Sequence, residues 1–184
     1  NNLVTGNGGT TALSGTIITT GAQVYNDAVN LTGATTLNAG AGDAITFAST
    51  LNGAQTLALN TSGVTTFGGV VGGTNALTSL TVAGASVLAN AASSISTVDA
   101  LALGAVTFDA SLVGDVTLSA SAAGGTIDVG VISDADTVLN DLTLTALGGI
   151  DATNIGSLVN PLGDITFTGD TPLGTTIVSA GAVV

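Results

Sequence analysis

The chain has 184 residues, of which 45% are hydrophobic, 3% aromatic and 7% charged, and its formal net charge is -12 because it contains no Lys, Arg or His. A chain without cations cannot displace counterions from phosphates, which excludes nucleic acid and anionic membrane surfaces as partners. No apolar run approaches the roughly 20 residues of a membrane-spanning helix, so we expect no membrane insertion.

The composition favours a folded all-β protein. Disordered chains are poor in apolar residues, and this one is rich in them. Val, Ile, Leu and Thr alternate between Gly and Asn, which is typical of strands. The chain has no Met and no signal peptide, so we expect a mature product or part of a longer protein. The absence of Cys, and of the Lys and Arg at which trypsin cleaves, favours an extracellular location.

Strand-like segments follow one another from Leu3 to the last residues, and one short phrase recurs among them. Its forms are "GDAITF" at 42–47, "GVTTF" at 63–67, "GAVTF" at 104–108, "GDVTL" at 114–118 and "GDITF" at 163–167. In each, a Gly turn precedes alternating residues, so the first and third of the last three residues are predicted to point inward and the middle one outward. The final segment, "TTIVSAGAVV" at 175–184, has the same character.

The rare aromatic residues reveal the period of the repeat. The four Phe are separated by about one, two and three times 20 residues, and aliphatic residues fill the gaps. The predicted core stack is Tyr25, Phe47, Phe67, Leu88, Phe108, Val129, Ile150 and Phe167. Two further apolar columns accompany it, and a turn position follows one of them at Gly53, Gly72, Gly114, Ser133, Gly156 and Gly174.

Three apolar columns with a period of about 20 to 22 residues predict a single right-handed parallel β-helix, or β-solenoid, of roughly eight to nine coils. Stacking at about 4.8 Å per coil would give a rod roughly 40 Å long. Residues 1–184 would form one domain. Because no amphipathic capping helix is visible, we expect both ends to be continued by more coils or by neighbouring copies. A two-sheet sandwich is the rival fold, and it predicts antiparallel hairpins.

Residues 19–84 carry a resemblance to a known group of proteins. They read "TTGAQVYNDAVNLTGATTLNAGAGDAITFASTLNGAQTLALNTSGVTTFGGVVGGTNALTSLTVAG". This stretch resembles the repeat arrays of filamentous-haemagglutinin-like and autotransporter-like bacterial surface proteins. The resemblance implies a right-handed β-helix at the cell surface, and it implies no catalytic residue.

Acidic side chains are the candidates for a metal site. Calcium binds carboxylate and carbonyl oxygens, and "SDADTVLND" at 133–141 places Asp134, Asp136 and Asp141 near one another in the sequence. The alternative is solvated charge that keeps the rod soluble. Other acidic residues are expected at strand starts or corners, as is Asp141: Asp43, Asp115 and Asp164.

Two further activities were weighed against the residues present. A carboxylate pair drawn from Asp128, Asp151 and Asp134 would suit glycoside hydrolysis, but the chain lacks Lys, Arg, His and Cys, so we expect no enzyme activity and no organic cofactor. Ice binding would need two Thr residues in every coil, stacked regularly on one flat wall. Doubled Thr occurs at Thr35/Thr36, Thr65/Thr66 and Thr175/Thr176, in different columns, which does not favour that function.

These observations lead to one functional hypothesis and one alternative. The hypothesis is a structural subunit or segment of an extracellular filament or surface fibre, with copies of itself stacked head to tail as partners. The alternative is a passenger or stalk segment of a large bacterial adhesin that binds a host or surface glycan. Self-assembly without a ligand would distinguish the first from the second.

Overall fold

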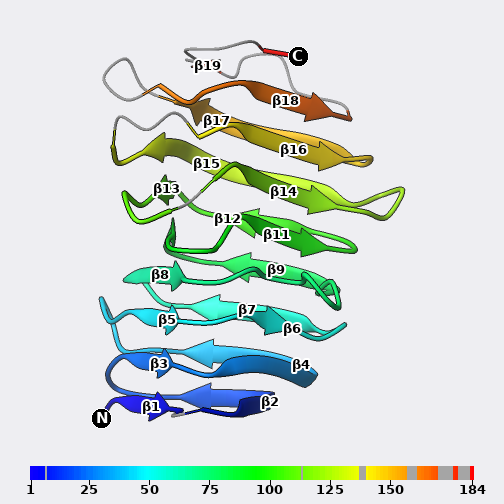
Figure 1. Ribbon diagram of the computed structural model, residues 1–184. Coiled ribbons are helices and arrows are strands. Elements are labelled where there is room, and N and C mark those ends of the chain that lie inside the picture. The colour runs from blue at the N-terminus through cyan, green and yellow to red at the C-terminus, as the bar shows by residue number, and fades with distance from the viewer. Residues whose placement is uncertain (7, 113, 137–139, 157–160, 170–175, 178–182) are drawn as a thin grey trace.

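The computed structural model describes residues 1–184 except 7, 113, 137–139, 157–160, 170–175 and 178–182. Its strands stack as a parallel β-solenoid, one turn above the next (Figure 1). Every strand pair in the described residues is parallel. The predicted all-β solenoid is therefore confirmed, and the antiparallel sandwich is excluded.

Each turn of the chain follows three walls, which we name A, B and C in chain order. Wall A contains the first halves of β2 (Thr10–Ile18) and β4 (Ala28–Asn38), then β6 (Leu51–Asn52), a bridge at Val71, β11 (Ser94–Thr97), β14 (Val116–Ala120), β16 (Leu142–Ala146) and β18 (Ile165–Thr168).

Walls B and C are joined into one sheet, because β15 (Thr126–Asp134) and β17 (Gly149–Ile155) each run from one to the other. The other strands of wall B are the second halves of β2 and β4, β7 (Thr56–Asn60), β9 (Ser79–Val82) and β12 (Leu101–Leu103). Those of wall C are β1 (Leu3–Thr5), β3 (Gln23–Tyr25), β5 (Ile45–Phe47), β8 (Val64–Phe67), β10 (Ala85–Leu88), β13 (Val106–Phe108) and β19 (Thr176–Ile177).

The length of a turn changes along the rod. Stacked residues are 20 to 22 positions apart where Asn2 meets Ala22, Asn26 meets Thr5 and Asn60 meets Asn38. The separation is 26 between Thr107 and Ser133. The extra residues lie in the corners at 109–115 and 121–125, outside the strands. On wall C, register partners lead from Leu3 to Ile177 in eight steps, so the described residues make about eight turns, close to the predicted eight to nine.

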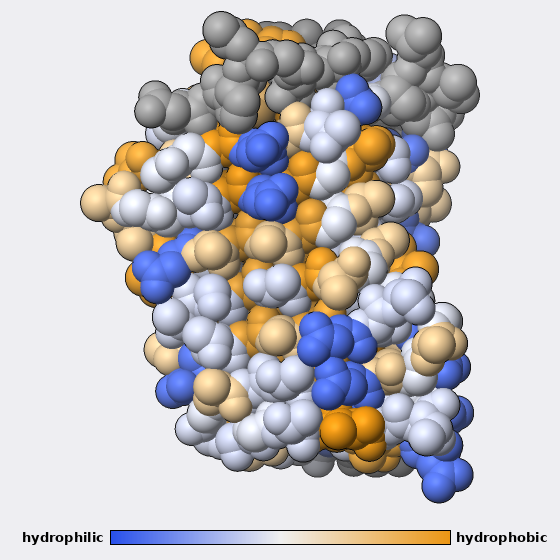
Figure 2. Space-filling model, turned by 180° about the vertical axis from the view of Figure 1, so that it is seen from behind, coloured by the Kyte–Doolittle hydropathy of each residue, from blue (hydrophilic) through white to orange (hydrophobic). Residues whose placement is uncertain are grey.

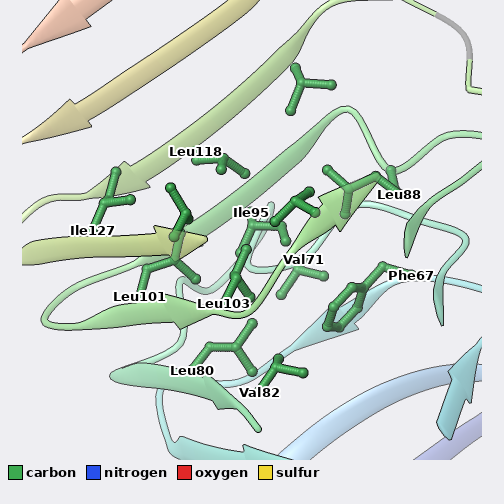
Figure 3. Close-up of a cluster of buried hydrophobic side chains, with 14 of the residues drawn as sticks. Phe67, Val71, Leu80, Val82, Leu88, Ile95, Leu101, Leu103, Leu118 and Ile127 are labelled. Carbon is green, nitrogen blue, oxygen red and sulfur yellow. The ribbon is translucent and has the colours of Figure 1, made fainter. Parts of the chain in front are cut away.

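The core is the space enclosed by the three walls, and it is filled by the inward half of each alternating strand. Val71, Ile95 and Leu118 enter it from wall A, Leu80 and Leu101 from wall B, and Phe67 and Leu88 from wall C, so that side chains from all three walls meet (Figure 3). All seven are at most 1% exposed. Burial of this apolar surface is the main force that holds the turns together.

The predicted core stack is correct over its first five members. Tyr25, Phe47, Phe67, Leu88 and Phe108 are register partners on wall C. The rings of Tyr25 and Phe47 stack at a centroid distance of 5.2 Å, and those of Phe47 and Phe67 at 5.7 Å. Offset-stacked rings at such distances stabilise beyond the area that they bury.

The last three members of the predicted stack lie in the core or against it, but their assignment to this column is wrong. Phe108 is followed on wall C by Asp134, whereas Val129 pairs with Leu103 on wall B. Ile150 pairs with Ile127 on wall B, and Phe167 pairs with Leu144 on wall A. The reason is the longer turn between Phe108 and Asp134: a fixed step of about 20 residues falls short and lands on an earlier wall.

Two kinds of glycine shape the corners. Of the predicted turn positions, Gly53, Gly72, Gly114 and Gly156 have positive φ, whereas Ser133 lies within β15 and Gly174 lies outside the described residues. A second set stacks between walls B and C at Gly63, Gly84 and Gly104. A Cβ on Gly84 would overlap the carbonyl oxygen of Gly63, and one on Gly104 would overlap that of Gly84, so this corner requires a residue without a side chain.

Candidate functional site

The three predicted calcium ligands do not form one site. Asp134 is buried, and its carboxylate accepts hydrogen bonds from the side-chain amide of Asn140 at 2.9 Å and from the backbone N–H of Asp136 at 3.3 Å. Asp141 is engaged elsewhere, with Asp115 and Asp164. Among the described residues, no group of three or more acidic side chains is arranged to hold a metal ion.

Three of the four predicted corner acids form a ladder at the start of wall A. The backbone N–H of Asp164 donates to the Asp141 carboxylate at 2.7 Å, and the N–H of Asp141 donates to the Asp115 carboxylate at 3.2 Å. The carboxylates of Asp115 and Asp141 thus each satisfy an amide of the next turn, which is a structural role. Asp43 stands apart, because it precedes β5 on wall C.

The remaining acidic candidates lie on different faces. Asp128 and Asp151 are register partners on wall B, and both are exposed. Asp134 belongs to wall C and points into the core, so it does not pair with them. Asp109 accepts hydrogen bonds from the hydroxyl and the backbone N–H of Ser111, and these hold the pKa of its exposed carboxyl below the usual value.

Wall A carries the most regular surface of the described residues, an arrangement that we call the hydroxyl array. Strands β11, β14, β16 and β18 lie directly above one another (Figure 1). Their outward positions form two files, each with one Ser or Thr per turn. The first file is Ser94, Thr117, Thr143 and Thr166, and the second is Ser96, Ser119, Thr145 and Thr168.

The alternation of β-strands explains why these eight side chains face outward. The residues between the two files are Ile95, Leu118 and Leu144, which are fully buried, and Phe167, which packs against the core. Neighbours in one file are about 4.8 Å apart, and the two files are about 6.6 Å apart, as parallel strands dictate. The Ser119 hydroxyl donates to that of Ser96 at 3.2 Å, which shows how closely neighbours within a file approach.

The other two walls lack this regularity. On wall C, the single outward file through Thr46 and Thr66 continues to Val87 and Thr107. On wall B, Ala58, Thr81 and Ala102 are followed by the charged Asp128. Seen from behind, the surface mixes pale and strongly hydrophilic residues with apolar ones (Figure 2).

The sequence suggests outward Thr ladders, among them "LTLT" at 142–145, but judging their regularity by adjacent Thr pairs does not reveal the hydroxyl array. Adjacent residues of a strand point to opposite sides, so Thr35 and Thr65 are buried whereas Thr36 and Thr66 face outward. Thr175 lies outside the described residues. The informative signal is Ser/Thr at every second position, as in "SIS" at 94–96, "TLS" at 117–119, "TLT" at 143–145 and "TFT" at 166–168.

The first turn offers a second kind of surface, an open strand edge. In the described residues β1 pairs with β3 alone and β2 with β4 alone, so the opposite edge of each strand has no ladder partner. The N–H of Leu3 and the carbonyl of Thr5 both bond to the β3 segment, and alternation therefore directs the N–H and carbonyl of Val4 to the open side. Such an edge is a template for further strands.

Comparison with known protein families, with curated proteins and with solved structures gives no match. The described residues include no helix long and apolar enough to cross a membrane.

Proposed function

We propose that this chain is a structural segment of an extracellular fibre at a bacterial surface, extended by β-solenoid turns that stack end to end. The observation that carries the proposal is the open edge of β1 and β2, which is continuous with the ladders of walls A, B and C. A further parallel strand on this edge would repeat the parallel pairing that joins the other turns of the solenoid. It would come either from a neighbouring copy or from adjoining residues of a longer protein.

The physical argument rests on the unpaired backbone groups. Edge N–H and C=O groups are obligatory hydrogen-bonding groups, and a partner edge of the same geometry satisfies several of them at once. Contacts between turns are local, so adding turns lengthens the rod without changing its cross-section. Head-to-tail association of this kind does not close on itself and therefore gives filaments.

The test is electron microscopy of the purified chain beside two variants of one residue. We expect fibres with an axial repeat of about 38 Å, which is eight turns at about 4.8 Å. Val4→Pro removes the N–H that faces the open edge and spares the hydrogen bonds of Leu3 and Thr5 to the β3 segment, so it should abolish fibres. Val4→Ala trims the same side chain, keeps the N–H, and should assemble like the parent chain.

The alternative function predicts a different result. A passenger or stalk segment of an adhesin would give discrete rods at all concentrations, and these rods would bind a glycan-bearing surface. Discrete folded rods from the parent chain would overturn the proposal of head-to-tail self-assembly. Equal fibre formation by Val4→Pro would show that assembly does not use the β1 edge.

A further inference from the structure

The hydroxyl array lies on the side of the rod, so its role is independent of what covers the ends. Eight Ser and Thr side chains occupy a two-dimensional lattice, with one spacing set by strand stacking and the other by strand alternation. None of the eight is charged. Every hydroxyl can both donate and accept a hydrogen bond, and each Thr adds a methyl group beside its hydroxyl.

The lattice is rigid before any ligand arrives. Strands β14 and β16 are paired on both sides, and Leu118 and Leu144 anchor them in the core with no exposed surface. Thr is β-branched, which restricts rotation about χ1 and fixes where its hydroxyl and methyl groups point. A preorganised surface loses little conformational entropy when it binds, so weak contacts repeated over the array can add up.

The chemistry of the array narrows the class of partner. A matching partner must be uncharged, hydrogen-bond in both directions and repeat in two dimensions. A phosphate-bearing polymer would need cations, of which the chain has none. The surface of a globular protein is irregular and does not match such a repeat over several turns. None of the eight array residues is aromatic, so the array offers no flat ring on which a sugar could stack.

We propose that the hydroxyl array binds a crystalline lattice of water, that is, the surface of ice. Water molecules in ice repeat in two dimensions and donate and accept hydrogen bonds, and the methyl groups of Thr117, Thr143, Thr145, Thr166 and Thr168 lie among the hydroxyls. The carboxylates of Asp115 and Asp141, which border the array, are engaged with backbone N–H groups of the next turn.

The proposal is tested by slowly growing ice from a dilute solution of the full chain and measuring how much protein enters the solid. Thermal hysteresis, the gap between melting and freezing points, is measured on the same samples. The parent chain should enter the ice and show hysteresis. Thr143→Lys places a long charged chain at the centre of the array and should lose both effects, while Thr143→Val removes one hydroxyl in the same shape and should weaken them.

Thr107→Lys is the matched control, because Thr107 is also half-buried, faces outward and lies on a strand, β13, that is paired on both sides, but on wall C. It should bind ice like the parent chain. Circular dichroism establishes that each variant is folded, and Thr143→Val serves if Thr143→Lys does not fold. The Val4→Pro background keeps the rods discrete and separates ice binding from fibre formation.

Several outcomes would overturn the proposal. One is exclusion of the folded parent chain from ice to the same degree as an inert protein. Another is an equal loss of ice binding in Thr107→Lys and Thr143→Lys, since the array would then not be the surface responsible. A third is adsorption to crystalline cellulose or chitin with exclusion from ice, which would assign the array to a solid polysaccharide.

Discussion

Tyr25 lies in the core, and it is the only side chain of the sequence that ionises at alkaline pH, because the chain has no Lys, Arg or Cys. Its ring is fully buried, and its hydroxyl donates to the side-chain carbonyl of Gln23 at 2.8 Å. The amide of Gln23 in turn donates to the backbone carbonyl of Asn38 at 2.9 Å. Burial raises the pKa of Tyr25 from 10.0 to about 12, because the interior disfavours the phenolate.

The raised pKa of Tyr25 predicts a loss of stability at alkaline pH. Below pH 10 Tyr25 is protonated in both the folded and the unfolded chain, and its contribution to the free energy of unfolding is fully present. Between about pH 10 and 12 the unfolded chain loses the proton while the folded chain keeps it, so the free energy of unfolding falls. Denaturant titrations at each pH, with tyrosinate absorbance, measure this decline. A Tyr25→Phe variant should show no such decline, because the chain has no Lys, Arg, Cys or His; an equal decline would contradict the assignment.

Two buried hydroxyls are a local cost in the core. The side-chain oxygens of Thr65 and Ser86, register partners on wall C, are fully buried and have no hydrogen-bond partner. A buried polar group without a partner costs about 1–3 kcal/mol of stability.

Thr65→Val keeps the shape of the side chain and should raise the free energy of unfolding by about 1 kcal/mol, as measured by denaturant titration. Thr66→Val, one position along and facing outward, should be close to neutral. Destabilisation by Thr65→Val would show that its hydroxyl bonds to a water molecule.

At the scale of an element, the corner between walls B and C depends on its stacked glycines for close packing of successive turns. We expect Gly84→Ala to lower the free energy of unfolding by about 1–3 kcal/mol or more, because its Cβ would overlap backbone oxygens of Gly63 and Thr61, which cannot move without shifting a turn. Gly124→Ala is the control, since a Cβ there meets no atom within 4 Å. Thermal and denaturant unfolding of the two variants gives the comparison. Equal stability would mean that the corner relaxes easily.

The strands were more predictable than their alignment. The column from Tyr25 to Phe108 could be found because aromatic residues are rare in this chain and the turns there are of even length. The corners at 109–115 and 121–125 are longer, and no residue pattern in them indicates the greater number of residues per turn. Val129, Ile150 and Phe167 were therefore predicted on the wrong walls. The hydroxyl array was readable in principle, because "TLT" and "TFT" need only strand alternation.

At the scale of the whole molecule, the charge of -12 opposes the association that the strand edges favour. Copies of a chain with one sign of charge repel one another, and salt screens that repulsion over about 10 Å at 0.1 M. We therefore expect fibres to form faster as salt is raised at pH 7, and faster again as the pH approaches the pI of about 4.1. Light scattering against ionic strength measures the trend, with Val4→Pro as the control. Rates independent of salt would contradict it.

The longer corners also bear on how such a rod can evolve. A corner at 109–115 or 121–125 takes up additional residues while the strands on either side keep their register with the turns above and below. An in-frame duplication of one turn would likewise add a rung whose two faces match the neighbours that they meet, since contacts run only between adjacent turns. Length is thus a heritable trait that changes in steps of one turn, and each step extends every file of surface residues by one.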